Sequence, residues 1–385
     1  MRPLFSKRAI RSILQITTVL GVFCFNGPLR LQAADTVDPA LARIDAETRI
    51  AWYDARAIGL EGQAWSDTRS PYDRLPAKAE GVVRAPVWEL SHHSAGLLVP
   101  FATSSPVIHA RWTLTSSRLE MPHMPATGVS GLDLYVRVND RWRWLANGRP
   151  AQQSNTAQLV TGLAAERREY LLYLPLYNGV SAVEIGIASD ASLERQPRAT
   201  ERRKPIVFWG TSITQGGCAS RPGMVHTAIV GRRLNWPVVN LGFSGNGKLE
   251  PEMARLIAEI DAAVFVLDCL PNLSPEEVAK LAEPAVRILR EARPDTPILL
   301  VEDRDYSDAF LVESKRNRNR DSQAALLRTY ERLNSDGCKQ LHYLKAETLF
   351  GNDGEDTVDS SHPTDLGFSR MADAFEAALK PLLKP

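Results

Sequence analysis

Cysteine is scarce in this chain, with 4 residues among 385. Cys24 lies in the N-terminal segment, and Cys218, Cys269 and Cys338 lie beyond it. Three thiols without the spacing of metal ligands provide no disulfide framework. They are therefore interpreted as buried thiols, and Cys218 as a packed one.

Long runs of charge of one sign are also lacking. The 46 basic residues nearly balance the 45 acidic ones, which leaves a net charge of +1. Proteins that bind nucleic acids or anionic membranes through charge carry a basic stripe or patch. The sequence therefore argues against a nucleic-acid partner.

The apolar run near the N-terminus, "ILQITTVLGVFCF", has 13 residues and is too short to favour a membrane-spanning helix. It follows the basic segment "MRPLFSKRAIRS" and precedes the small residues Ala33 and Ala34, which suit a signal peptidase. Residues 1–34 are predicted to be a signal peptide, with an uncleaved N-terminal anchor as the alternative. We expect export to the periplasm or the extracellular space, with no membrane span after processing.

The pattern of the mature chain changes near residue 200. Up to about residue 190, short β-rich runs are separated by turn residues, and Ile108, Ala110, Trp112 and Leu114 alternate as one face of a strand would. Such a pattern predicts a β-sandwich domain, jelly-roll-like, over residues 35–195. The polar stretch 191–205 is interpreted as a linker. The predicted strands are "GLLVPF", "VIHARWTLTS", "LDLYVRV", "RWRWLAN", "YLLYLPL" and "AVEIGIAS".

Beyond the linker, apolar runs alternate with helical patterns. Near-continuous apolar strands separated by helices predict an α/β domain over residues 201–385, with a parallel sheet covered on both faces. Ligands of such sheets bind beyond the carboxyl ends of the strands. The expected strands are "PIVFW", "PVVNL", "AAVFVL", "PILLV" and "LHYL".

Polar groups suited to acyl transfer follow these strands. Ser212 comes after the first run, Gly242 after the second and Asn272 after the third, while Asp359 and His362 precede the last helix. A serine needs an imidazole to take its proton, and the imidazole needs a carboxylate on its other nitrogen. The Ser212 amide, the Gly242 amide and the Asn272 side chain could stabilise an oxyanion. Taken singly, Ser212 could be a helix N-cap and the others turn residues.

These segments resemble the ordered blocks of the SGNH hydrolases, also called GDSL-type esterases. The blocks are "GTSIT", "NLGFSGNG", "LPN" and "DSSHP", and "GLDLY", Gly131–Tyr135, resembles the signature of a subgroup with an N-terminal β domain. The resemblance implies a flavodoxin-like, three-layer catalytic domain. It also implies a serine esterase, with Ser212, Asp359 and His362 as triad and Ser212, Gly242 and Asn272 around the oxyanion.

Two departures from the family pattern concern the first and third blocks. Thr211 replaces the aspartate of "GDS", and "CLPN" replaces "GxND", where proline alters the backbone that aims Asn272. The histidine could also act with Ser212 as a dyad.

The substrate is less clearly indicated. Export beside a β domain resembles carbohydrate esterases, so we expect an ester substrate such as an acetylated polysaccharide or oligosaccharide. A lipid or small-ester acylhydrolase and an inactive carbohydrate-binding protein are the alternatives. Trp142 and Trp144 share one face of a strand and are interpreted as core or as a sugar-stacking platform.

No cofactor or metal is expected. His92, His93 and His123 lie among β-domain loops without a carboxylate or cysteine at ligand spacing. The basic segment "RNRNRD", residues 316–321, is interpreted as a solvated loop.

Overall fold

The computed structural model describes residues 36–195 and 203–383. The predicted signal peptide and residues 196–202 of the predicted linker lie outside the described residues. Among the residues that are described, no helix has the length and apolar character needed to cross a membrane.

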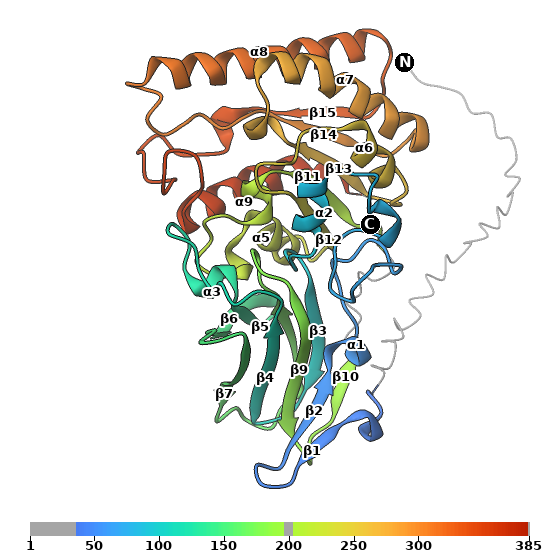
Figure 1. Cartoon of the computed structure of the whole chain (residues 1–385), viewed down its shortest axis with the longest axis vertical. Coiled ribbons are helices and arrows are strands. Elements are labelled where there is room, and N and C mark those ends of the chain that lie inside the picture. The colour runs from blue at the N-terminus through green and yellow to red at the C-terminus, as the bar shows by residue number, and fades with distance from the viewer. Residues whose placement is uncertain (1–35, 196–202, 384–385) are drawn as a thin grey trace, which may run out of the picture. The chain divides into compact units, whose positions relative to one another are not determined.

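The N-terminal part contains two five-stranded antiparallel sheets, ordered β1-β2-β9-β4-β7 and β10-β3-β8-β5-β6 (Figure 1). The strands are β1 (Arg43–Asp45), β2 (Ile50–Asp54), β3 (Leu98–Thr103), β4 (Val107–Leu114), β5 (Leu132–Val138), β6 (Arg141–Gly148), β7 (Ser154–Thr161), β8 (Arg168–Tyr173), β9 (Val180–Ala188) and β10 (Leu193–Arg195). Short helices lie between them: α1 (Ala55–Ile58), α2 (Ala85–Ser91) and α3 (Ala126–Val129).

The β-rich pattern predicted six of these strands correctly. In β4 the residues predicted to form one face are buried and their neighbours are partly exposed. Strands β1, β2, β7 and β10 were missed. Both β1 and β10 have only three residues, and β10 occupies the start of the predicted linker. In β7 only Asn155 is buried, so its sequence carries little apolar alternation.

The C-terminal part contains a five-stranded parallel sheet in the order β12-β11-β13-β14-β15. Counted within this part the order is 2-1-3-4-5, that of flavodoxin-like sheets. Its strands are β11 (Ile206–Gly210), β12 (Val238–Gly242), β13 (Val264–Asp268), β14 (Ile298–Val301) and β15 (Leu341–Leu344). Its helices are α4 (Ser212–Gln215), α5 (His226–Arg233), α6 (Pro251–Ala258), α7 (Pro275–Ala292), α8 (Glu313–Ser335) and α9 (Asp365–Leu379). The predicted parallel α/β domain is therefore confirmed, and the β-rich part that precedes it consists of antiparallel sheets.

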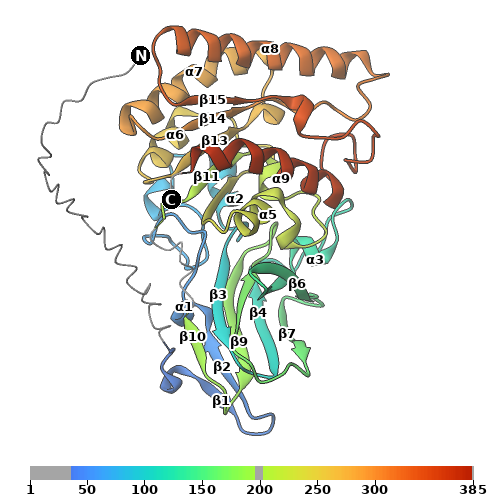
Figure 2. The same ribbon diagram turned by 180° about the vertical axis from the view of Figure 1, so that it is seen from behind.

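Helices cover both faces of the parallel sheet, which explains why its strands are mostly apolar. Val207 and Trp209 of β11 belong to one hydrophobic cluster, together with residues of α6, α7 and α8. Ile206 and Phe208 point the other way and pack with residues of α5 and α9. Figure 2 shows α5 and α9 on the near side of the sheet.

The interpretation of residues 316–321 as a solvated loop was wrong, because they lie inside helix α8. Arginine is a good helix former, and side chains of this segment form hydrogen bonds with the rest of the protein. Asn319 is buried, accepts a hydrogen bond from the Tyr306 amide at 3.1 Å and donates one to the Arg304 carbonyl at 2.9 Å.

Candidate active site

The five predicted site residues come from segments at the carboxyl edge of the parallel sheet. Ser212 begins α4 directly after β11, and Gly242 ends β12. Asn272 lies in the single 3₁₀ turn Leu270–Asn272 after β13. Asp359 and His362 lie in the loop before α9. A parallel sheet brings such segments together because its strands all end on the same side.

Ser212, His362 and Asp359 form a continuous hydrogen-bonded chain. The Oγ of Ser212 lies 2.8 Å from Nε2 of His362, and Nδ1 of His362 lies 2.8 Å from Oδ2 of Asp359. The imidazole thus has a hydroxyl on one nitrogen and a carboxylate on the other, the arrangement of a serine nucleophile with its base. Ser212 is not the N-cap of α4, because Thr211 accepts from the Ile213 amide in that position.

A tight turn aims the imidazole. Oδ1 of Asp359 accepts hydrogen bonds from the amides of His362 at 2.8 Å and Ser361 at 3.2 Å, and Ser360 adopts a φ of 72°. Burial opposes ionisation of Asp359, but the backbone and ring of His362 outweigh it and lower the pKa of the carboxyl. Asp359 is therefore a carboxylate that faces the ring.

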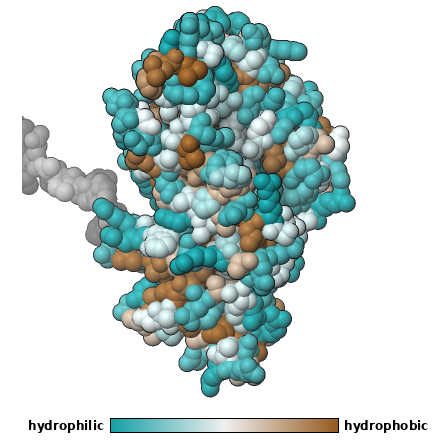
Figure 3. All heavy atoms as spheres, turned by 60° about the vertical axis from the view of Figure 1, so that its left-hand side comes forward, coloured by the Kyte–Doolittle hydropathy of each residue, from teal (hydrophilic) through white to brown (hydrophobic). Residues whose placement is uncertain are grey.

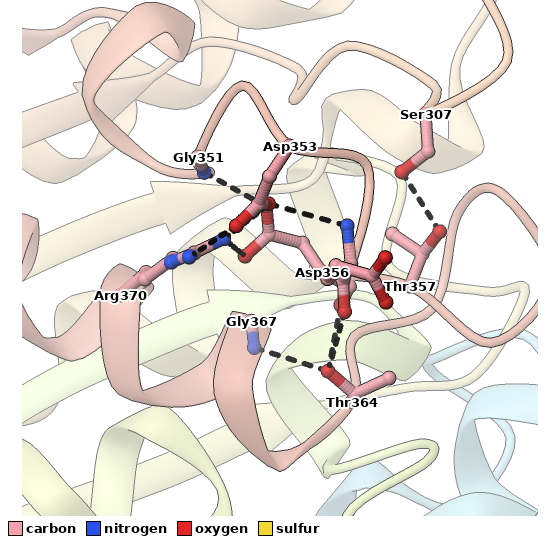
Figure 4. Close-up of polar contacts among 9 residues, drawn as sticks. Ser307, Gly351, Asp353, Asp356, Thr357, Thr364, Gly367 and Arg370 are labelled. Carbon is pink, nitrogen blue, oxygen red and sulfur yellow. Dashed lines mark hydrogen bonds and ion pairs between the residues drawn. The ribbon is translucent and has the colours of Figure 1, made fainter.

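The loop that carries this pair is anchored to α9 (Figure 4). Arg370 of α9 binds both carboxylate oxygens of Asp356 at 3.0 Å, and the Gly351 amide donates to Asp356 at 2.8 Å. Thr364 caps α9 by accepting from the Gly367 amide at 3.2 Å. The Asp356 side chain is 2% exposed, so these bonds hold the base of the loop in a largely dry environment.

Two of the expected residues offer hydrogen-bond donors at this edge of the sheet. The Ser212 amide is among the first of α4, which have no acceptor within the helix. The carboxamide of Asn272, oriented by its partners, accepts from the amides of Asn246 at 3.0 Å and Gly247 at 3.2 Å. The NH₂ group of Asn272 is then left to donate to another acceptor. The preceding proline, which departs from the family pattern, does not prevent this orientation.

The oxyanion role predicted for Gly242 is contradicted by its hydrogen bonds. Its amide donates to Oδ1 of Asn240 at 2.9 Å, and its carbonyl accepts from Arg74 at 2.7 Å. A Cβ at this position would lie 2.1 Å from the Gln215 nitrogen, so the glycine permits close packing. Gly245 of the same loop is exposed with a φ of 68°, and no partner of its amide is found among residues 36–195 and 203–383. The segment "NLGFSGNG" offers three glycines, and the sequence alone could not choose among them.

Ion pairs from α8 and from the segment after β14 hold the block that contains Asn272. Arg318 pairs with the buried Asp303 and donates to the carbonyls of Pro271 and Leu273, each at 3.0 Å. Arg304 binds both oxygens of Asp268, at 2.6 and 2.7 Å, at the end of β13.

A segment of the β domain contributes a histidine to the edge of the site. The His123 ring centroid lies 5.8 Å from that of His362, and ligand atoms of His123, Cys218 and His362 lie within 4.8 Å of one another. A surface hollow of about 650 Å³ is lined by residues 120–125 and Val358. Sequence reasoning missed this neighbourhood because no local pattern links three distant segments.

The two tryptophans considered for sugar stacking are not fully buried. Trp144 is 49% exposed, and its indole nitrogen donates to Asp133 at 2.9 Å. On the face shown in Figure 3, apolar residues form separate patches among polar ones.

Comparison with known proteins gives two family matches. Residues 203–380 match the GDSL-like Lipase/Acylhydrolase family, and residues 50–193 match the GxDLY model, described as the N-terminus of SGNH-hydrolase-type esterases. No curated protein sequence matches the chain.

Among solved structures, a GDSL-like lipase from Bacteroides ovatus is 34% identical, with a TM-score of 0.83 over 87% of this chain and 99% of its own. The salicylyl-acyltransferase SsfX3 of a tetracycline biosynthetic pathway is 20% identical, with a TM-score of 0.66 over 89% and 97%. A family two carbohydrate esterase from Clostridium thermocellum, solved with cellohexaose, is 16% identical, with a TM-score of 0.52 over 74% and 92%. The last two show likeness of fold.

Proposed function

Since the chain belongs to the GDSL-like lipase/acylhydrolase family of SGNH esterases, we propose that it hydrolyses a carboxylic ester through an acyl-enzyme on Ser212. The observation that carries this proposal is the hydrogen-bonded chain from Ser212 through His362 to Asp359. We also interpret the two antiparallel sheets as a jelly-roll-like sandwich, and the parallel-sheet domain as three layers.

The reaction begins when Nε2 of His362 takes the proton of Ser212 as Oγ attacks the ester carbonyl carbon. The tetrahedral intermediate collapses, the bond to the alcohol oxygen breaks, and His362 returns the proton to the leaving alcohol. Water then attacks the acyl group with His362 again as base, which releases the acid and restores the serine. Asp359 keeps the proton on Nδ1 and stabilises the imidazolium.

Three donors are assigned to the oxyanion. They are the Ser212 amide, the NH₂ group of Asn272 and the Gly245 amide, which replaces Gly242 in this role. Loss of one such donor in other hydrolases costs about 10²–10³ in turnover.

The substrate we propose is an O-acetylated carbohydrate, and the enzyme is exported by its N-terminal segment. The proposal is supported by the fold shared with a carbohydrate esterase solved with cellohexaose and by the half-exposed Trp144. The alternatives are a lipid or small-ester substrate. Release of acetate from acetylated xylan and cellulose oligomers, compared with hydrolysis of long-chain esters, separates these substrate classes.

The nucleophile is tested with Ser212→Ala. The variant should lose hydrolysis of a short-chain chromogenic ester, at least about 10³-fold in kcat, because in the described part of the chain no hydroxyl other than that of Ser212 is bonded to His362 Nε2. Its stability should stay near that of the wild type, because Thr211 rather than Ser212 caps α4. Ser335→Ala, an exposed serine at the end of α8, is the matched control. Turnover near the wild-type rate in Ser212→Ala would exclude the mechanism, and an inactive wild type would favour the carbohydrate-binding alternative.

A further inference from the structure

We propose that His123, Cys218 and His362 form a binding site for a soft or borderline divalent cation such as Zn²⁺. The bound ion inhibits the esterase. The three ligand atoms already lie within 4.8 Å of one another. Inhibition rests on the function proposed for His362, whereas binding of the ion does not.

The donor set suits zinc rather than magnesium or calcium. Two imidazoles and one thiolate are ligands that zinc accepts, and soft donors select against cations that prefer oxygen. Zinc–ligand bonds of about 2.0–2.3 Å place neighbouring ligand atoms of a tetrahedron roughly 3.3–3.8 Å apart. The groups must therefore approach by about 1 Å, and the exposed side chain of His123 has the freedom to do so.

The hydrogen bond from His362 to Asp359 provides the outer support that zinc-binding histidines commonly have. Nδ1 of His362 is held by Oδ2 of Asp359 at 2.8 Å, which leaves Nε2 as the ligand nitrogen. A carboxylate behind a histidine fixes its tautomer and increases the basicity of the other nitrogen. The pairing that prepares His362 to act as a base therefore also prepares it to bind a metal.

Cys218 supplies the third donor from a buried position. Burial, with the nearby charge of Asp359, raises the pKa of the Cys218 thiol to about 12, so the metal-free thiol keeps its proton. Zinc displaces this proton to solvent when the sulfur–metal bond forms. The thiolate and Asp359 then place two negative charges near the cation, which stabilises it.

Hydrolysis and metal binding compete for the same lone pair. Nε2 of His362 faces the Ser212 hydroxyl at 2.8 Å in the metal-free site. Once that lone pair binds a metal, it cannot take the serine proton, so turnover stops until the ion leaves. The hollow lined by His123 and Val358 gives the ion a route from solvent.

The first experiment measures binding without reference to turnover. The full chain is dialysed against a chelator, and Zn²⁺ binding is measured by equilibrium dialysis. Co²⁺ is then added as a spectroscopic probe, because ligation by a thiolate produces a charge-transfer absorption. We expect one ion per chain, and we expect Cys218→Ser to remove the thiolate band. No binding of either ion, or the full band in Cys218→Ser, would overturn the proposal.

The second experiment measures inhibition. Zn²⁺ should abolish hydrolysis of the chromogenic ester by the metal-free enzyme, EDTA should restore it, and Mg²⁺ should have no effect. His123→Ala and Cys218→Ser should each raise the inhibitory Zn²⁺ concentration at least tenfold while metal-free turnover changes less than twofold. His342→Ala and Cys338→Ser are matched controls outside the site and should be inhibited like the wild type.

Two outcomes would overturn the inhibitory role: stimulation by Zn²⁺, or unchanged inhibition in both site variants. His123 is exposed, so its variant remains informative if substitution of the buried Cys218 impairs folding. Zinc binding by an enzyme that shows no esterase activity would contradict the proposed function and leave the metal site standing.

Discussion

At the scale of single residues, the candidate site depends on how Asp359 divides its two carboxylate oxygens. One oxygen accepts from the backbone of the turn, and the other accepts from the His362 ring. The residue therefore shapes the loop and also faces the charge that forms on the imidazole. These two roles can be separated, because an amide in place of the carboxylate keeps one acceptor oxygen but loses the charge.

Asp359→Asn should lower kcat/KM strongly at every pH at which the wild type is active. Because the pKa of Asp359 is lowered, its carboxylate becomes protonated only when the pH falls below the usual range for an aspartate. Asp359 is therefore charged at neutral pH. An amide neither stabilises the imidazolium nor keeps the proton on Nδ1 of His362, so transfer of the Ser212 proton is impaired. The measurement is kcat/KM against pH for the two proteins.

Asp190→Asn, which removes an exposed carboxylate in the β domain, is the control for that profile. An Asp359→Asn profile and rate equal to the wild type would remove Asp359 from the mechanism. A modest loss would indicate that Ser212 and His362 act as a dyad.

At the scale of elements, helix α8 positions the segment that carries Asn272. The Arg318 guanidinium spans from Asp303 to the carbonyls on either side of Asn272. "LPN" lies in a single 3₁₀ turn with no long helix of its own, so its aim depends on such external bonds. If Asn272 has the proposed oxyanion role, Arg318 is expected to act as a positioning residue through it.

Arg318→Lys should reduce kcat on the order of tenfold and leave KM within about twofold. Lysine keeps the charge opposite Asp303 but cannot span two carbonyls with a planar fork, so Asn272 should lose its aim toward the oxyanion. The same substitution should have little further effect in an Asn272→Ala background, because the group being positioned is gone. Steady-state kinetics of both singles and the double variant test this.

Arg320→Lys is the matched control on the same helix, because Arg320 is exposed and pairs with Asp321. Wild-type kcat in Arg318→Lys, or an undiminished effect in the Asn272→Ala background, would assign Arg318 a purely structural role.

At the scale of the whole molecule, the "GLDLY" segment of the β domain is bonded to the segment that follows the serine block. Asp133 accepts from Arg221 and from the Gly223 amide, each at 2.8 Å, and Arg221 also reaches the Tyr135 hydroxyl at 2.6 Å. A Cβ at Gly223 would lie 2.3 Å from the Tyr135 ring. The two sequence signatures therefore describe two sides of one contact.

Asp133→Ala should reduce the free energy of unfolding by about 3 kcal/mol. This value is at the low end of the range for breaking a buried ion pair, because the Arg221 side chain is partly exposed to solvent. The loss arises because the cation and the Gly223 amide are left without their buried acceptor. Urea unfolding followed by tryptophan fluorescence measures it. Asp140→Asn, just beyond β5 and 94% exposed in its side chain, should change stability by less than about 0.5 kcal/mol, because asparagine tolerates the φ of 59° at this position. Equal effects of the two substitutions would contradict this role of Asp133.

The local pattern of apolar and polar residues was sufficient to predict most strands and helices of the fold. Apolar runs such as those of β11 and β13 could be read as parallel strands because both of their faces are buried, which leaves no polar alternation. The start of α8 could not be read in the same way, because its arginines are stabilised by Asp303 and by carbonyls that only the folded chain brings near. Strand β7 likewise lacks the apolar alternation that marks β4.

For the candidate site, the sequence by itself determined which residue types follow each strand, because parallel connections deliver these segments to one edge. Ser212, Asn272, Asp359 and His362 were named on that basis, and their catalytic roles remain to be tested. Only the tertiary structure argued against Gly242 as an oxyanion donor, because its amide donates to the side chain of Asn240. Only the tertiary structure placed His123 and Cys218 beside His362, because contacts between segments so distant along the chain leave no periodic signal in the sequence.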